Sequence, residues 1–226
     1  MQIDQLKFPF AAVLWDMDGT LIDSEPIWIE EESRLMRSLG ANWTDLDAKH
    51  CLGGPIERVD AYMRERAGNR HAPLELSNLL IERMVDRLAA ETAFTPGARN
   101  LIDELCALPV PMALVSASTR SIMDAALESI GSHYFKITIS HDDVSQTKPD
   151  PEGYLAAAAA IGVPIEETLI IEDSITGMTA AIDSGAYVLG LTHMVDLPSS
   201  SRTIHLEALH GLDAVALGRL FQAIMV

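Results

Sequence analysis

Short apolar segments alternate with amphipathic helical segments along most of this chain, and this alternation constrains the fold more than any other feature. Five segments have the length and apolar content of buried strands: residues 11–16, 112–116, 137–140, 168–172 and 187–191. Strands that alternate with helices form parallel sheets that are covered by helices on both faces. We therefore predict an α/β fold, a doubly wound parallel sheet with a Rossmann-like core.

Residues that favour helix ends lie between these strands. Ser174 is predicted to cap the N-terminus of a helix, and Gly185 to end it. Thr95 and Pro96 are predicted to supply the N-cap and the first-turn proline of another helix. These signals predict one helix after the strand at residues 168–172 and another before the strand at residues 112–116.

The segment from about residue 25 to residue 93 breaks the alternation, because it contains no convincing strand. Three helical patterns are predicted there, with apolar faces formed by Trp28, Leu35 and Leu39, by Ile56, Val59 and Met63, and by Ile81, Met84, Val85 and Leu88. A helical unit inserted straight after the first strand is expected over the C-terminal end of that strand. We predict a Rossmann-like catalytic core of residues 1–22 and 94–226, and an inserted α-helical cap domain, or lid, of residues 23–93.

The composition excludes several classes of partner. Asp and Glu number 33 against 16 Lys and Arg, so the net charge of −17 opposes binding to nucleic acid and to anionic membranes. The chain has no apolar run long enough to cross a bilayer and no secretory signal, so we expect a cytoplasmic protein. Cys51 and Cys106 are expected to be reduced thiols. An anionic substrate would need local positive charge from a metal, a lysine or helix N-termini.

Polar side chains follow the first two predicted strands at the edge where ligands bind in open parallel sheets. Asp16 and Asp18 come directly after the apolar run 11–15. Two carboxylates crowded together repel each other unless a cation or a shared proton relieves them. Ser116 ends the second strand, and with Ala117 it offers a hydroxyl and backbone N–H groups that could bind an anion.

Two further loops add charge at the same edge. Lys148 lies in a proline-bounded loop before a helix, and Glu172 and Asp173 end the fourth predicted strand. Taken singly, these features resemble an acidic turn, a surface turn and a helix cap. Their order along one sheet favours a site, because carboxylates from two loops can hold Mg²⁺ together with a substrate phosphate, and the lysine can bind the remaining phosphate charge.

These residues resemble the four ordered motifs of the haloacid dehalogenase superfamily. The matching segments are Asp16-Met17-Asp18-Gly19-Thr20-Leu21, Ser116, Lys148 and Glu172-Asp173-Ser174. The continuation Ile22-Asp23-Ser24-Glu25-Pro26 and the helical insert are similar to the beta-phosphoglucomutase-like branch, and within it to bacterial sugar-phosphate and hexitol-phosphate phosphatases. The resemblance covers essentially the whole chain, although its specific motifs lie in the core.

The resemblance implies a Mg²⁺-dependent phosphatase for a small phosphomonoester, a sugar or polyol phosphate. Asp16 would be the nucleophile that forms an aspartyl-phosphate, and Asp18 the general acid and then the general base. Ser116, the backbone of Ala117 and Lys148 would bind the phosphoryl oxygens.

The same resemblance implies the metal ligands. Asp16, the backbone carbonyl of Asp18, and Asp173 would hold Mg²⁺, and Glu172 would support it directly or through water. We expect a monomer whose partner is a small phosphorylated molecule, with no nucleic acid and no membrane.

Two rival functions of the superfamily are not favoured. Its dehalogenases lack the second aspartate, so Asp18 argues against that activity, and its phosphonatases use a cap lysine, an activity that we set aside because Lys49 is the only lysine between residues 25 and 93. A beta-phosphoglucomutase-type sugar phosphomutase stays open as an alternative, although Trp28 occupies the position of the cap histidine of those mutases. A catalytically silent binding protein is a further alternative.

Substrate selectivity is expected to depend on residues of the lid. The candidates are Trp28, Gly54 and Arg58. Trp28 also lies on an apolar helical face, which favours core packing, and Arg58 is typical of a solvated charge on a helix.

Overall fold

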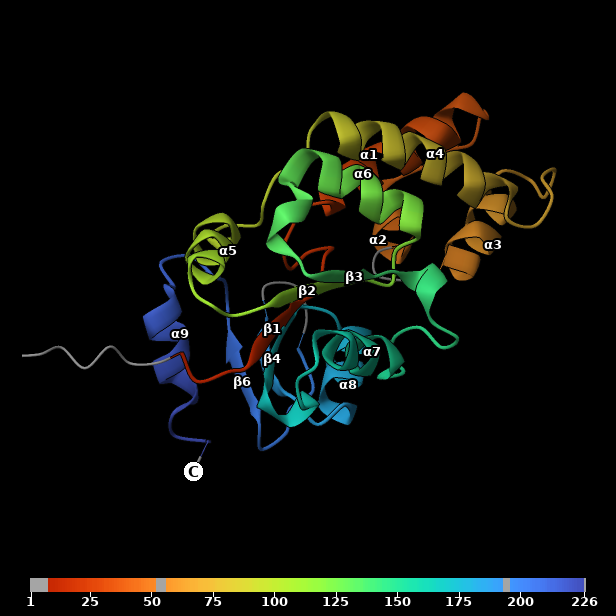
Figure 1. Ribbon diagram of the computed structural model, residues 1–226. Helices are drawn as coiled ribbons and strands as arrows, with labels where there is room; N and C mark the ends of the chain where they lie inside the picture. Colours follow the sequence, from red (N-terminus) through yellow and green to blue (C-terminus); the bar gives the residue numbers. More distant parts are fainter. Residues whose placement is uncertain (1–7, 52–55, 193–195, 226) are drawn as a thin grey trace, which may run out of the picture. The chain divides into compact units, whose positions relative to one another are not determined.

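The core of the molecule is a parallel sheet. The structure is a computed structural model, and it describes residues 8–51, 56–192 and 196–225. Within these residues the sheet has six strands in the order β3-β2-β1-β4-β5-β6 (Figure 1). The strands are β1 (Ala12–Trp15), β2 (Met112–Val115), β3 (Ile137–Ile139), β4 (Thr168–Glu172), β5 (Tyr187–Leu191) and β6 (Thr203–Leu206). All five predicted strands are confirmed.

The sixth strand, β6, was not predicted from the sequence. It is an edge strand that, among the described residues, pairs only with β5, and all four of its residues are half-buried. An edge strand need not carry the continuous apolar run of a strand buried on both faces. The strand β6 therefore lacks the apolar run from which the other five strands were predicted.

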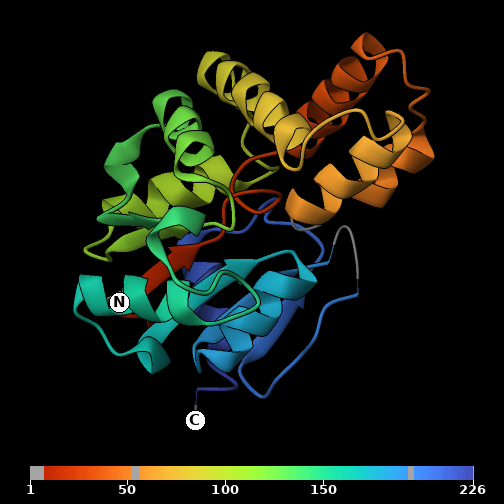
Figure 2. The ribbon, with the colours of Figure 1, turned by 90° about the vertical axis from the view of Figure 1, so that its right-hand side faces the viewer.

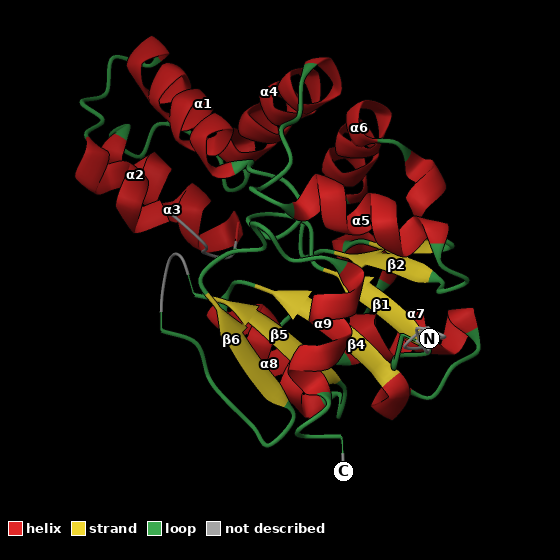
Figure 3. Cartoon of the chain, turned by 90° about the vertical axis from the view of Figure 1, so that its left-hand side faces the viewer, coloured by secondary structure: helices red, strands yellow, loops and turns green. Residues whose placement is uncertain are grey.

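Helices cover both faces of the sheet, as the doubly wound prediction requires. Figure 2 shows α7 and α8 side by side on one face, and Figure 3 shows α5 and α9 on the other. The bounds are α5 (Ala98–Ala107), α6 (Arg120–Ile130), α7 (Glu152–Ile161), α8 (Ile175–Asp183) and α9 (Ala214–Phe221). Short 3-10 turns follow at Ser132–Tyr134, His141–Asp143 and Ile165–Glu167.

Strand β1 lies at the centre and is completely buried. Ala12 and Leu14 join the apolar cluster under α7 and α8, and alternation along the strand directs Val13 and Trp15 to the opposite face. Burying large apolar side chains of this kind stabilises a fold by roughly 1.5–3 kcal/mol each. The segment that carries the predicted nucleophile is therefore anchored in the most buried part of the core.

The register of the sheet aligns the ends of its strands. Trp15 pairs with Leu114 of β2 and with Ile171 of β4. The residues that follow these pairs therefore emerge at one edge of the sheet. Asp16 and Glu172 are two of them.

Contacts divide the chain into two compact units. The core unit comprises Met1–Asp23, Ala93–Met123 and Gly131–Val226, and the helical unit comprises Ser24–Thr92 and Asp124–Ile130. The helical unit contains α1 (Glu25–Ser38), α2 (Asp45–Cys51), α3 (Ile56–Arg66) and α4 (Glu75–Ala90), with α4 packed against α1 and α3. The three predicted helices are present, and α2 is an addition. That this segment acts as a lid stays a prediction.

Of the two predicted N-caps, one is confirmed and one is wrong. Ser174 accepts a hydrogen bond from the backbone of Gly177 over 3.0 Å and caps α8, as predicted. Thr95 does not cap α5, because its hydroxyl donates instead to the carbonyl of Thr20 over 2.5 Å, and Gly97 precedes the helix. The hydroxyl of Thr95 thus connects the segment before α5 to the loop after β1 through a hydrogen bond.

Two expectations from composition can be compared with the structure. Cys51 and Cys106 are both free thiols, as expected. Among the described residues, no helix combines the length and the apolar character needed to span a membrane.

Candidate active site

Four charged side chains from three loops meet at the C-terminal edge of the sheet. The ammonium of Lys148 lies 2.5 Å from Oδ1 of Asp16 and 2.7 Å from Oε1 of Glu172. Asp16, Glu172 and Asp173 each have a carboxylate oxygen within 4.8 Å of the others. All four side chains are buried. The structure therefore brings together the predicted residues of the first, third and fourth motifs.

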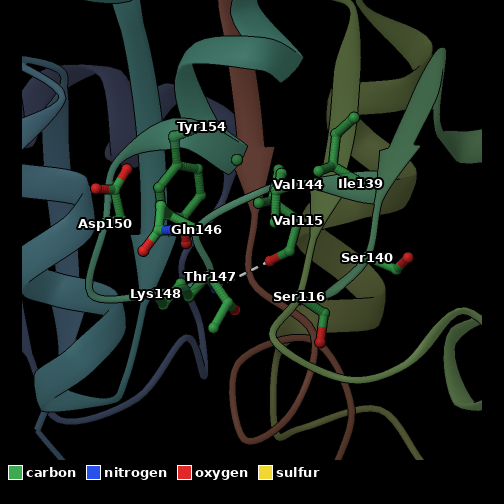
Figure 4. Close-up of a pocket in the computed structure, with 11 residues that line it drawn as sticks. Val115, Ser116, Ile139, Ser140, Val144, Gln146, Thr147, Lys148, Asp150 and Tyr154 are labelled. Carbon is green, nitrogen blue, oxygen red and sulfur yellow. Dashed lines mark hydrogen bonds between the residues drawn. The ribbon is translucent and has the colours of Figure 1, made fainter. Parts of the chain in front are cut away.

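The ammonium of Lys148 also contacts a backbone carbonyl and an aromatic ring. Its Nζ also donates to the carbonyl of Val115 over 2.9 Å, the contact drawn as a dashed line in Figure 4. The ring of Tyr154 lies next to it, with Nζ 4.9 Å from the ring centre. Burial opposes a charge here, but the carboxylates of Asp16 and Glu172 outweigh it and raise the pKa of Lys148. The surroundings of Lys148 therefore favour its charged ammonium form.

Glu172 is surrounded by donors. Its Oε1 accepts from Lys148 and from the hydroxyl of Tyr154 over 2.8 Å, and its Oε2 accepts from the backbone of Asp173 over 3.0 Å and from the amide and hydroxyl of Ser174, both over 3.2 Å. A Cβ atom on Gly177 would stand 1.7 Å from Oε1, so this arrangement requires glycine there. Burial, reinforced by the charge of Glu172, raises the pKa of the Tyr154 hydroxyl, which stays a donor.

Asp173 is positioned by the loop after β1. The hydroxyl of Thr20 donates to its Oδ1 over 2.9 Å. Gly19 has a φ of +81° and packs directly on the carboxylate, because a Cβ atom there would stand 2.2 Å from Oδ2. Burial and the charge of Glu172 raise the pKa of Asp173 to about 7.

The pKa of Asp16 is raised by the same main causes as that of Asp173. Burial is the largest cause that raises its pKa, followed by the charge of Glu172, while Lys148 opposes the shift. The single positive charge of Lys148 faces three carboxylates at this edge. A further cation would relieve the excess negative charge.

These residues fit a divalent metal. Mg²⁺ prefers hard oxygen ligands and is usually bound by one or two carboxylates, water and a substrate phosphate. Asp16 and Asp173 supply carboxylate oxygens from two different loops, and these oxygens lie within 4.8 Å of one another. Because protein donors already occupy both oxygens of Glu172, its support for an ion would pass through its neighbours.

Asp18 and Ser116 form a second cluster beside the first. The hydroxyl of Ser118 donates to Oδ2 of Asp18 over 2.7 Å, and that of Ser116 lies 3.3 Å from the same atom. The oxygen of Ser116 also accepts from the backbone of Ser118 over 2.9 Å. Ala117 is exposed in the loop between β2 and α6. The predicted acid and the predicted phosphate-binding loop are therefore in contact.

The candidate substrate residues lie in the helical unit. Trp28 is half-buried, so it is not part of the buried core that the sequence favoured for it. Arg58 is exposed and donates to the carbonyl of His50 over 2.7 Å, which satisfies a carbonyl near the end of α2. Gly54 lies outside the described residues.

Three contributors to the site were not predicted from the sequence. Thr20 lies within the first motif and Ser118 two residues after Ser116, so the positions of their hydroxyls near the neighbouring carboxylates had a local signal. Tyr154 carried no such signal, because a tyrosine in the first turn of a helix is typical of core packing. Its contact with Glu172 depends on the register between α7 and β4.

Comparisons with known proteins agree with this geometry. Residues 13–191 match the sequence pattern of the family described as Haloacid dehalogenase-like hydrolase. Validoxylamine A 7'-phosphate phosphatase of Streptomyces hygroscopicus subsp. limoneus is 32% identical, over 81% of this chain and 86% of its own. Hexitol phosphatase B of Escherichia coli is 30% identical, over 75% of this chain and 78% of its own.

A solved structure with the same fold is that of beta-phosphoglucomutase from Clostridium difficile. It has a TM-score of 0.73 and 18% identity, and the match covers 96% of this chain and 99% of that one. This likeness shows the fold. Because the family pattern spans most of the sequence and the site residues meet at the expected edge, the chain belongs to the haloacid dehalogenase-like hydrolase family.

Proposed function

We propose that this protein is a Mg²⁺-dependent phosphatase that hydrolyses a small phosphomonoester, a sugar or polyol phosphate, through an aspartyl-phosphate on Asp16. The observation that carries the proposal is the environment of Asp16. A buried carboxylate stands at the tip of a central strand, 2.5 Å from a lysine ammonium and beside two further carboxylates. The names of the two phosphatase relatives, and hexitol in one of them, support this substrate class.

In the first step, a carboxylate oxygen of Asp16 attacks phosphorus while the bond from phosphorus to the alcohol oxygen breaks. Asp18 gives its proton to the departing alcohol. In the second step, Asp18 takes a proton from water as that water attacks phosphorus, and the bond to Asp16 breaks. Inorganic phosphate leaves, and both aspartates return to their starting forms.

The hydrogen bonds around Asp18 suit it to this exchange of protons. Ser118 and Ser116 both contact Oδ2, which fixes the orientation of the carboxyl group. A general acid has to be within hydrogen-bonding distance of the group it protonates, and a fixed carboxyl group meets that demand without reorganisation.

Positive charge and N–H groups at this edge are proposed to bind the transferred group. Lys148 holds Asp16 and offsets charge on the phosphoryl oxygens, and Ser116 and the backbone of Ala117 bind those oxygens. The carboxylates of Asp16 and Asp173 and the backbone carbonyl of Asp18 would hold Mg²⁺, with Glu172 in support. When bound, the metal supplies charge that offsets the negative phosphoryl group.

The helical segment 23–93 is proposed to act as a lid that excludes water during transfer and selects the substrate. Trp28 and Arg58 are its candidate selective residues. A mutase would need a proton-exchanging group where this chain has Trp28, and an indole cannot exchange a proton at neutral pH. For this reason we favour hydrolysis over transfer back to a sugar.

The test is release of inorganic phosphate from a panel of sugar and polyol phosphates, with Mg²⁺ and with excess chelator. We expect phosphate release with Mg²⁺ and its loss with chelator, and Asp16→Asn serves as the inactive control. Full activity in excess chelator would contradict the metal requirement.

A second assay separates phosphatase from mutase. Beta-glucose 1-phosphate is supplied with a priming bisphosphate, and free phosphate and glucose 6-phosphate are followed in the same reaction. We expect free phosphate to accumulate faster. Faster accumulation of glucose 6-phosphate would favour the mutase.

A further inference from the structure

Tyr154, in the first turn of α7, contacts both partners of the lysine–glutamate pair. Its hydroxyl donates to Oε1 of Glu172 over 2.8 Å, and its ring lies beside the ammonium of Lys148. The residue is only 1% exposed. In the proposed mechanism Tyr154 touches neither the phosphoryl group nor Asp16, so any effect on the reaction has to pass through these two neighbours.

The hydrogen bonds at Glu172 leave little freedom. A carboxylate oxygen has two lone pairs, and at Oε1 these are taken by Tyr154 and Lys148. Three donors from Asp173 and Ser174 approach Oε2. The Glu172 carboxylate is therefore fixed in position and orientation, and Tyr154 is the only neutral side chain from outside its own loop among these donors.

The ammonium of Lys148 is equally determined. Its three protons match three acceptors, on Asp16, Glu172 and Val115. If Glu172 turned away, Lys148 would lose one of the acceptors that direct it toward Asp16. The position of the lysine thus depends on the orientation of a carboxylate that Tyr154 helps to hold.

We propose that Tyr154 is a positioning residue, whose hydroxyl fixes the Glu172 carboxylate so that Glu172 holds Lys148 against Asp16. Glu172 then acts mainly as the holder of Lys148. The consequence for catalysis rests on the proposed function, but the consequence for Lys148 itself does not. This difference allows the two to be tested separately.

Tyr154→Phe removes only the hydroxyl and keeps the ring beside Lys148. Tyr134→Phe is a matched control, because the hydroxyl of Tyr134 also donates to a carboxylate, Oδ1 of Asp103, over 2.5 Å, and Tyr134 is 6% exposed. Both variants lose one hydrogen bond from tyrosine to carboxylate in the core unit. A general effect on folding should therefore be similar in the two.

The first measurement observes Lys148 directly and needs no substrate. The sequence contains four lysines, so a spectrum of the protein labelled with ¹⁵N-lysine is simple, and the Lys148 signal is the one lost in Lys148→Arg. In the presence of Mg²⁺, we expect slow exchange of the Lys148 ammonium protons with water in the wild type and in Tyr134→Phe. In Tyr154→Phe we expect exchange at least about tenfold faster, since a hydrogen bond to a charged group is lost. Unchanged exchange in Tyr154→Phe would overturn the proposal.

The second measurement asks whether Tyr154 acts through Glu172. With p-nitrophenyl phosphate and saturating Mg²⁺, we expect Tyr154→Phe to lower kcat about tenfold and to change KM by less than about twofold, because Ser116 and the backbone of Ala117 still bind the phosphoryl group. In a Glu172→Gln background the same substitution should have almost no further effect, since coupled residues are non-additive. Additive losses would overturn the proposal. If the wild type hydrolyses no phosphomonoester, the proposed function fails, and proton exchange at Lys148 still decides the role of Tyr154.

Discussion

Two buried aspartates of the helical unit and two of the core unit have pKa values that are shifted in opposite directions. In the helical unit, Asp47 and Asp60 are 4% and 1% exposed, and the pKa of each carboxyl is lowered. In the core unit, Asp16 and Asp173 are 7% and 8% exposed, and the pKa of each is raised. The exposed fractions of the four side chains are similar, so the balance between burial, neighbouring charges and hydrogen-bond donors decides the direction of each shift.

The surroundings differ in what donates to the carboxylate. Asp47 accepts from the amide and hydroxyl of Thr44 and from the hydroxyl of Tyr62, and Arg66 adds an ion pair. These contacts stabilise the first turn of α2, so the Asp47 carboxylate has a structural role. At Asp16 and Asp173, burial and repulsion outweigh the donors that the protein supplies. A carboxylate cluster left in this state is suited to a cation and a reaction.

The largest contrast is expected from replacing one aspartate in each unit. Asp16→Asn should abolish turnover, with a loss of at least about 10⁴-fold, because the nucleophile is removed. Asp60→Asn should leave kcat within about twofold but destabilise the protein by roughly 1–3 kcal/mol, since Asp60 accepts from the backbone of Leu74 and Ser77. Phosphate release and urea unfolding measure the two effects. Substantial activity in a folded Asp16→Asn protein would break the comparison.

A smaller effect is expected from removing one cation in each unit. Lys148→Ala should lower the rate about 100-fold, the scale of losing one electrostatic stabiliser. Lys148→Arg should rescue poorly, because a planar guanidinium does not reproduce a compact ammonium. Arg66→Ala, at the half-exposed ion pair with Asp47, should cost about 1 kcal/mol or less and no activity. Near-normal kinetics of Lys148→Ala would count against the role of the lysine.

The raised pKa values predict how stability depends on pH and on metal. Because the pKa of Asp173 is raised to about 7, we expect the folded protein to keep a proton there up to about pH 7, whereas the unfolded chain loses it near pH 4. The metal-free protein should therefore lose stability as pH rises through this window, by up to about 1.4 kcal/mol per pH unit for one proton. Because Mg²⁺ binds the ionised form, it should stabilise the protein more at about pH 8 than at about pH 5.

Thermal unfolding at both pH values, with and without Mg²⁺, measures this effect. Glu32, in the helical unit, also has a pKa raised by burial to about 7 and contributes in the same direction. Glu32→Gln is therefore the background in which to compare metal effects. Equal stabilisation by Mg²⁺ at the two pH values would contradict the prediction.

The smallest effect is expected at the structural carboxylate Asp47. Tyr62→Phe removes a hydrogen bond of 2.6 Å to its Oδ1. The remaining donors keep the carboxylate satisfied, so the cost should be about 1 kcal/mol, with kcat unchanged. Urea unfolding and kcat measured on the same preparation test both parts. A clear fall in kcat would show that the role of Asp47 is not structural alone.

The sequence predicted the parts of this molecule that local chemistry specifies. Strands such as β2 are continuous apolar runs, and Asp16, Lys148 and Asp173 stand directly at strand ends or beside prolines. The helix that Ser174 caps was equally legible, because a cap depends on residues three positions apart.

What the sequence missed depends on contacts distant along the chain. Tyr154 is 18 residues from Glu172, and Thr20 is 153 residues from Asp173. Thr95 has the chemistry of an N-cap, but the carbonyl of Thr20 competes for its hydroxyl. Such outcomes follow from the packing of α5, α7 and the loop after β1, and no local pattern encodes them.

In the proposed mechanism Asp16 carries the phosphoryl group, and a trapping experiment tests this most directly. p-Nitrophenolate leaves as a stable anion without needing a proton, so Asp18→Asn should still phosphorylate Asp16 but hydrolyse the phosphoenzyme slowly. With p-nitrophenyl phosphate and Mg²⁺, we expect a burst of p-nitrophenolate equal to the enzyme concentration. After an acid quench, mass spectrometry of peptic peptides should place the phosphoryl group on Asp16. Steady turnover without a burst or a phosphorylated peptide, or a phosphoryl group on another residue, would contradict this account.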